Sequence, residues 1–206
     1  MNNAGILRDK SFHNMTPDLY DAVIDVHLRG AYYVTVAAWP LMREQGYGRV
    51  GGFARHRPPV FFGNFGQANY GAAKMGLVGF TNVLAVEGAK YNIKANSIAP
   101  LAMTRMTEDL LGGELGAALG PELISPLVTY LSSEGCDATG RVFSVGGGRV
   151  AEIFIGEAPG YMDTNLTPES LAANWDAVTN QEGYFVPNTV GDETMYYLEQ
   201  IKKAAQ

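Results

Sequence analysis

The sequence predicts an α/β fold in which helices cover a small parallel β-sheet. Of 206 residues, 47% are hydrophobic and 25 are glycine, which provides a core and many tight turns between strands and helices. Segments with apolar residues at helical spacing alternate along the chain with short apolar runs typical of strands. The clearest case is a helix expected over residues 67–90, followed by a strand over residues 94–98, as in a β-α-β unit.

A long helix is expected over residues 17–45. Thr16 can cap it with its hydroxyl, Pro17 suits the first helical position, and Asp18 places a negative charge in the first turn. We expect this helix to bend near Gly30. Apolar residues recur through it at helical spacing, namely Leu19, Val23, Val26, Ala31, Val34, Ala38 and Leu41.

The glycine tract 146–148 lies between two expected strands. A phosphate-binding loop has to lead into a helix, so we interpret this tract as a turn. The same criteria place the other elements, which in chain order are a strand from residue 49, a helix over 121–133, strands over 141–145 and 149–155, and helices over 165–175 and 193–205.

Tyr70 and Lys74 carry the main chemical indication. Residues four apart on a helix share one face, and an ammonium group beside a phenol favours the phenolate, which lowers a tyrosine pKa from about 10. Such a phenol suits a general acid for carbonyl reduction or a base for alcohol oxidation. The small residues 71–73 would let a flat cofactor or another helix approach closely. The alternative is a chance pair, because the chain holds eleven tyrosines.

The sequence motifs around this pair resemble those of the short-chain dehydrogenase/reductase superfamily. The closest branch is the (3R)-hydroxyacyl-CoA dehydrogenase part of the peroxisomal multifunctional enzyme, with its stand-alone bacterial relatives. The resemblance covers residues 2–175. It rests on Asn-Asn-Ala-Gly-Ile-Leu-Arg-Asp-Lys-Ser-Phe at 2–12, Val-His-Leu-Arg-Gly at 26–30, Gly-Asn-Phe-Gly-Gln-Ala-Asn-Tyr at 63–70, Asn-Ser-Ile-Ala-Pro at 96–100 and Thr-Arg-Met at 104–106.

This resemblance implies an N-terminally truncated, partial Rossmann-like fold. The chain would form one incomplete domain over residues 1–206, a doubly wound parallel sheet that keeps strands 5, 6 and 7 of the family with flanking helices. Residues 146–206 would form a C-terminal extension packed on it. The glycine-rich turn that meets the cofactor pyrophosphate has no counterpart in the sequence. The strand from residue 49 would then be an exposed sheet edge.

The resemblance also assigns the site. Tyr70 would transfer the proton. Lys74 would lower the pKa of Tyr70 and bind the nicotinamide ribose. His27 stands where the superfamily usually has a catalytic asparagine; it would hold a water in the proton path to Lys74, or else be a satisfied structural histidine. The cofactor would be NAD, with NADP possible, held by Asn3, Ala4, Gly5, Tyr70, Lys74, Pro100 and Thr104.

Residues 51–62 depart from the family pattern. Paired glycines and paired prolines should break a buried strand, and no serine or threonine lies between Arg49 and Gln67. The family's substrate-binding serine would fall at Arg57. Our hypothesis is an out-of-frame tract, and the alternative is a diverged loop. Translating the DNA in the other two frames tests this, because the hypothesis requires a serine-containing, strand-like peptide.

Composition narrows the possible partners and locations. A net charge of −6 argues against nucleic acid, and no group of residues has metal-ligand spacing. The single cysteine, Cys136, allows no internal disulfide, and the apolar run 31–42 is too short to span a bilayer. The sequence shows neither a signal peptide nor a peroxisomal C-terminal address, so we expect a cytoplasmic protein without membrane partners.

Three functional readings remain open. The first is hydride transfer between a nicotinamide cofactor and a 3-hydroxyacyl or 3-oxoacyl thioester. The second is a catalytically impaired fragment that keeps only the dimerisation surface, formed as a homodimer through the helices 17–45 and 67–90. The third is a short-chain reductase for another carbonyl substrate.

Overall fold

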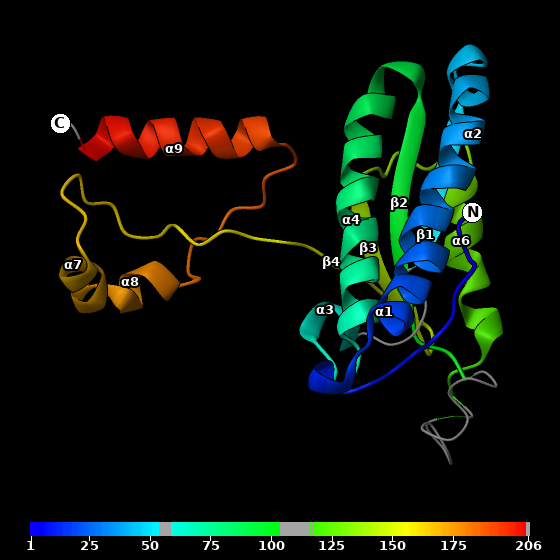
Figure 1. The fold of residues 1–206 in the computed structure, drawn as a ribbon. Helices are drawn as coiled ribbons and strands as arrows, with labels where there is room; N and C mark the ends of the chain where they lie inside the picture. The colour runs from blue at the N-terminus through cyan, green and yellow to red at the C-terminus, as the bar shows by residue number, and fades with distance from the viewer. Residues whose placement is uncertain (54–58, 104–115, 117, 205–206) are drawn as a thin grey trace. The chain divides into compact units, whose positions relative to one another are not determined.

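A computed structural model describes residues 1–53, 59–103, 116 and 118–204 of the chain (Figure 1). Within it the chain forms two compact units, Met1–Ile153 and Phe154–Gln206. The packing of residues 146–206 on the remainder as part of one domain stays a prediction.

The first unit contains a four-stranded sheet in the order β1-β2-β3-β4. The first three strands are parallel and β4 pairs antiparallel to β3, through a turn in which Gly147 and Gly148 have φ of +56° and +78°. This confirms the α/β, partial Rossmann-like fold with three neighbouring parallel strands. The strands are β1 (Gly48–Phe53), β2 (Ile93–Pro100), β3 (Arg141–Gly146) and β4 (Arg149–Ile153).

The glycines of β1 do not interrupt it, so that expectation was wrong. The strand continues through Gly51 and Gly52 and stays paired with β2. A Cβ on Gly52 would lie 3.0 Å from the Oγ of Ser97, which is hydrogen-bonded to Thr81 Oγ1 at 2.8 Å in the core. Glycine therefore makes room for a buried polar pair. On its other side β1 pairs with Asn2, whose amide donates to the Gly51 carbonyl at 2.9 Å.

One helical rod crosses the sheet where residues 17–45 predict it (Figure 1). Thr16 has the extended backbone of an N-cap but its hydroxyl makes no capping hydrogen bond, so the predicted hydroxyl cap was wrong. Pro17 at the first position has no amide hydrogen to satisfy, and Asp18 supplies the first-turn charge. The rod consists of α1 (Pro17–Ile24), the π-helical η2 (Asp25–Arg29) and α2 (Gly30–Glu44).

Helix α4 (Ala68–Gly88) runs beside this rod and packs on the sheet (Figure 1). It is continued by η3 (Ala89–Tyr91), which confirms the predicted helix 67–90. Two buried clusters join these layers. One consists of Val23, Tyr70 and Ala73, packed against Ile6, Leu7 and Ile24. The other consists of Leu84, Ala85 and Ala95, packed against Trp39, Val50 and Phe80.

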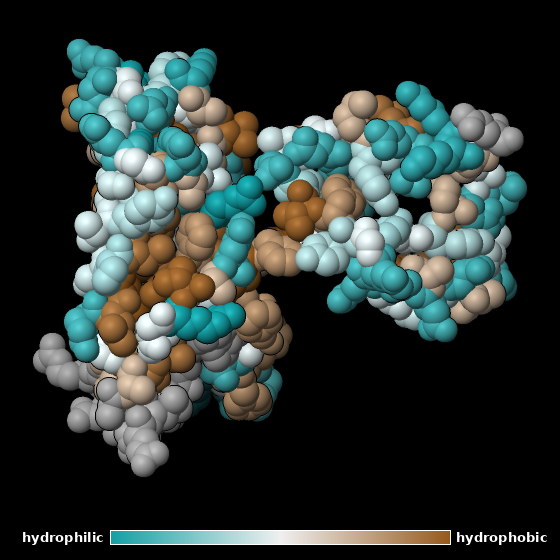
Figure 2. Space-filling model, turned by 180° about the vertical axis from the view of Figure 1, so that it is seen from behind, coloured by the Kyte–Doolittle hydropathy of each residue, from teal (hydrophilic) through white to brown (hydrophobic). Residues whose placement is uncertain are grey.

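Helix α6 (Ser125–Ser132) packs against β1 on the opposite face, which is turned to the viewer in Figure 2. Apolar residues gather there over the middle of the first unit. A small hollow of about 30 Å³ beside α6 has Met1, Val50, Ile98, Val128 and Leu131 among its lining residues. The short elements of this unit are η1 (Phe12–Asn14), α3 (Pro59–Phe62) and η4 (Pro121–Leu123).

The second unit holds α7 (Pro168–Ala173), α8 (Trp175–Thr179) and α9 (Val190–Ala204). Thr167 caps α7, and its hydroxyl accepts a hydrogen bond from the Ser170 amide at 3.0 Å. The predicted single helix 165–175 is two short helices, because Asn174 ends α7 and folds its side chain back onto the Ser170 carbonyl. No helix in the described part of the chain is long and apolar enough to cross a bilayer.

Candidate active site

Tyr70 and Lys74 lie in the first two turns of α4. Because α4 runs opposite to the parallel strands, its start lies at their carboxyl ends, near Pro100, where open α/β sheets bind ligands (Figure 1). Both side chains are only 1% exposed. The Lys74 Nζ is 5.4 Å from the centroid of the Tyr70 ring, so the two residues share one helix face as their spacing predicts.

His27 comes to this pair from the π-helical turn of the neighbouring rod. Its ring meets the Tyr70 ring edge-on, with centroids 5.2 Å apart. The Nε2 atom lies 2.8 Å from the Ile6 carbonyl oxygen and 3.1 Å from the Ile6 nitrogen, so it donates to the carbonyl in one tautomer and accepts from the amide in the other. A Cβ on Gly5 would come within 2.6 Å of the His27 Cε1, so glycine is required for this contact.

The environment of His27 keeps it neutral. Burial lowers its pKa from 6.5 to about 4, with the positive charge of Lys74 acting in the same direction and the hydrogen bond to Ile6 opposing both. Among the described residues the buried Nδ1 atom has no hydrogen-bond partner. His27 therefore presents an uncharged ring nitrogen beside Tyr70 and Lys74.

Asn69 is a site residue that the sequence reasoning missed. It is fully buried, and its Nδ2 donates to the carbonyls of Arg8 at 2.9 Å and Leu19 at 3.0 Å. Its Oδ1 accepts from the Tyr70 amide at 2.7 Å. The side chain thus ties the start of α4 to the loop at residue 8 and to α1. The signal was its place directly before Tyr70 in the 63–70 motif.

The other predicted cofactor residues lie around the same end of the sheet. Asn3, Ala4 and Gly5 follow the pairing of Asn2 with β1, so they lie near the carboxyl end of that strand. Pro100 is the buried last residue of β2. Thr104, like Arg57 at the expected serine position, lies outside the described residues.

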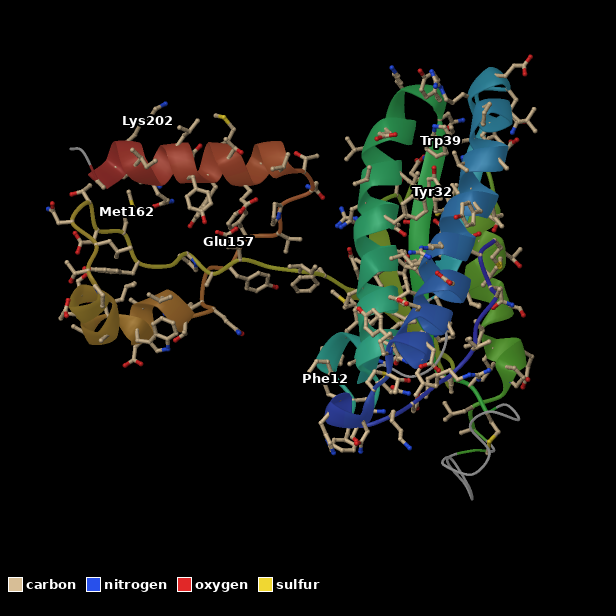
Figure 3. The ribbon with its side chains drawn as sticks, in the orientation of Figure 1. Phe12, Tyr32, Trp39, Glu157, Met162 and Lys202 are labelled. Carbon is tan, nitrogen blue, oxygen red and sulfur yellow. The ribbon has the colours of Figure 1, made fainter. Side chains whose placement is uncertain are left out.

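A cavity of about 340 Å³ opens beside the start of α4. Tyr70 forms part of its wall, together with Phe12 and residues of the turn 63–67. Figure 3 shows Phe12 at the short helix η1, near this end of α4. Within the described ranges, no group of three or more His, Cys, Asp or Glu side chains could hold a metal ion.

This chain is similar to known proteins over most of its length. It is 49% identical to a short-chain type dehydrogenase/reductase of Mycobacterium tuberculosis over 89% of its own length and 64% of the relative. It is 47% identical to the peroxisomal hydratase-dehydrogenase-epimerase of Saccharomyces cerevisiae, covering 87% of this chain and 20% of that protein. The chain thus spans less than two thirds of either relative.

A solved structure and a family-wide sequence model agree with these matches. The full-length peroxisomal multifunctional enzyme type 2 of Drosophila melanogaster superposes with a TM-score of 0.89 at 35% identity, covering 98% of this chain and 37% of that one. The sequence model of short chain dehydrogenases matches residues 1–112, which include Tyr70, Lys74 and His27. The chain therefore belongs to the short-chain dehydrogenase family.

Proposed function

We propose that this site transfers hydride between a nicotinamide cofactor and a 3-hydroxyacyl or 3-oxoacyl thioester. The buried juxtaposition of Tyr70 and Lys74 at the carboxyl ends of the parallel strands carries the proposal. The thioester class is supported by the motifs at 2–12, 26–30 and 63–70, which resemble the hydroxyacyl-CoA dehydrogenase branch. NAD is the cofactor expected from that branch, and NADP is the alternative.

We expect these residues to suit the nicotinamide end of such a cofactor, because the Lys74 ammonium can donate a hydrogen bond to a ribose hydroxyl. Gly5 gives the His27 ring its space beside Tyr70. The positions that would hold the cofactor are Asn3, Ala4, Gly5, Tyr70, Lys74, Pro100 and Thr104. When bound, the cofactor would supply or accept the hydride.

The remaining chemistry falls to three side chains. Tyr70 would donate its phenolic proton to the carbonyl oxygen in reduction, or take the hydroxyl proton in oxidation. The Lys74 ammonium beside the ring favours the phenolate and would hold the nicotinamide ribose. His27 is uncharged, and its Nδ1 has no hydrogen-bond partner among the described residues. This nitrogen would hold a water that relays the proton toward Lys74.

Cofactor and substrate binding can be tested separately. Titration of the purified chain against NADH fluorescence should give saturable, micromolar binding, and no binding would refute the proposal for this chain. A panel of 3-hydroxyacyl thioesters and other secondary alcohols then tests the substrate class. Turnover confined to a non-thioester alcohol would favour a reductase for another carbonyl.

A second candidate is a chain that only associates with itself. The rod and α4 expose large apolar side chains, among them Tyr32 (Figure 3), which favours a homodimer through the helices 17–45 and 67–90. Arg57 stands where the family's substrate-binding serine would fall. Sedimentation velocity should show a dimer, and Val83→Asp should dissociate it. A monomer at all concentrations would exclude this reading. The exposed residues are Tyr32, Tyr33, Val34, Val36, Leu41, Met75, Val83 and Val86.

A further inference from the structure

The cavity beside the start of α4 has the size of a small-molecule site. Its volume of about 340 Å³ lies at the lower end of the range for ligand pockets, roughly 300–1,000 Å³. All of its described lining residues are uncharged. The lining therefore offers no positive charge to a phosphate or carboxylate group, so burial of such an anion is disfavoured. A hydrocarbon chain can be buried without a counter-charge.

Two phenylalanine rings at this cavity are exposed without an evident structural reason. Phe12 in η1 is 79% exposed, and Phe65 in the turn before α4 is 88% exposed. Both line the cavity. Ligand pockets are typically lined by apolar and aromatic side chains of this kind.

The segments that carry the two rings are tied to each other. The Lys10 amide donates to the Gly66 carbonyl at 2.8 Å, and the Gln67 Nε2 donates to Asp9 Oδ2 at 2.7 Å. Gly66 has φ of +81°, a conformation that a residue with a side chain rarely adopts. The two walls of the cavity are thus held in place by the fold itself.

Tyr70 connects this cavity to the reacting centre, because it belongs to the cavity wall and is the proposed proton donor. We propose that Phe12 and Phe65 form the subsite for the hydrocarbon tail of the acyl thioester and determine the chain lengths that bind. This inference rests on the proposed function for the identity of the thioester. The tail would extend from the carbon whose oxygen meets Tyr70 into the cavity.

Calorimetric binding of butanoyl-CoA and octanoyl-CoA to the full chain tests the subsite without any turnover. Each methylene buried in an apolar site strengthens binding about three- to fourfold. We expect octanoyl-CoA to bind at least about tenfold more tightly than butanoyl-CoA. The Phe12→Ala and Phe65→Ala variants should each reduce this ratio, and the double variant should bring it to about twofold or less.

Phe62→Ala is the matched control, because Phe62 is 76% exposed and close in sequence but does not line the cavity. It should keep the full ratio. An equal ratio in the double variant and the unchanged chain would overturn the inference, as would equal binding of both thioesters to the unchanged chain. Loss of turnover in Tyr70→Phe with an unaltered ratio in the double variant would leave the proposed function standing and the subsite refuted.

Discussion

The His27 ring meets the Tyr70 ring edge-on, with 5.2 Å between centroids and 86° between planes. The contact joins the π-helical turn of the rod to the first turn of α4. Single π-helical turns inside α-helices are frequent at functional sites. Here that turn carries the buried ring which reaches both Tyr70 and the backbone of Ile6.

Tyr70→Phe removes the phenolic hydroxyl and keeps the ring that packs against His27. If Tyr70 transfers the proton, the rate should fall about 10²- to 10⁴-fold while the fold is retained. Initial rates of NADH formation from a 3-hydroxyacyl-CoA, with circular dichroism as the structural check, measure this. Tyr130→Phe removes a hydroxyl from an exposed tyrosine of α6 and should leave the rate unchanged. A Tyr70→Phe enzyme with normal rates would disprove the assigned role.

Gly5→Ala should displace His27. The added Cβ would lie 2.6 Å from the His27 Cε1, closer than such contacts allow, so the ring or the backbone must move. Overpacking of this kind costs about 1–3 kcal/mol of unfolding free energy. Urea unfolding gives the loss in stability, and loss of activity in the folded variant would show that His27 has to be in place.

Gly71→Ala is the control for that substitution. A Cβ on Gly71 would meet nothing within 4 Å, and alanine is favoured over glycine inside a helix by about 0.5–1 kcal/mol. This variant should be as stable as the unchanged chain or more stable. If both alanine variants lose stability equally, the steric explanation for Gly5 is wrong.

Local patterns in the sequence were enough for the order of elements and for the central pair. The spacing of apolar residues predicts the rod and α4, and the i, i+4 relation predicts that Tyr70 and Lys74 share a face. Neither feature depends on residues distant in the chain. The π-helical turn at His27 was not predicted, because one additional residue in a turn leaves the apolar pattern helical.

Contacts between distant segments could not be predicted in this way. From the sequence alone, Gly52 resembles a strand breaker. In the structure, a side chain at this position would crowd the hydrogen-bonded pair of Ser97 in β2 and Thr81 in α4. Asn69 looks like an ordinary polar residue in the first turn of a helix until the carbonyls of Arg8 and Leu19 approach its amide. In both cases the tertiary environment, rather than the local propensity, decides which residue fits.

Asn69→Ala should destabilise the start of α4. It removes three hydrogen bonds and leaves the Arg8 and Leu19 carbonyls and the Tyr70 amide without this partner. We expect a loss of about 2–4 kcal/mol in unfolding free energy, measured by urea titration. Asn64→Ala, which removes one exposed hydrogen bond to Gln67, should cost less than about 1 kcal/mol. Equal losses in the two variants would contradict the role of Asn69.

His27 should make the stability of the chain depend on pH. Its pKa falls from 6.5 to about 4 on folding, mainly through burial, so the unfolded chain binds the proton more readily than the folded one. The contribution of His27 to the unfolding free energy is therefore complete above pH 6.5 and is lost as the pH falls toward 4. The total loss is on the order of 3 kcal/mol. His27→Asn cannot titrate in this range. Urea titration should show that the unfolding free energy drops between pH 7.5 and pH 4.5. This drop should be about 2–3 kcal/mol smaller in the variant, because the variant lacks the titrating imidazole of His27. The same drop in both proteins would mean that His27 does not carry the effect.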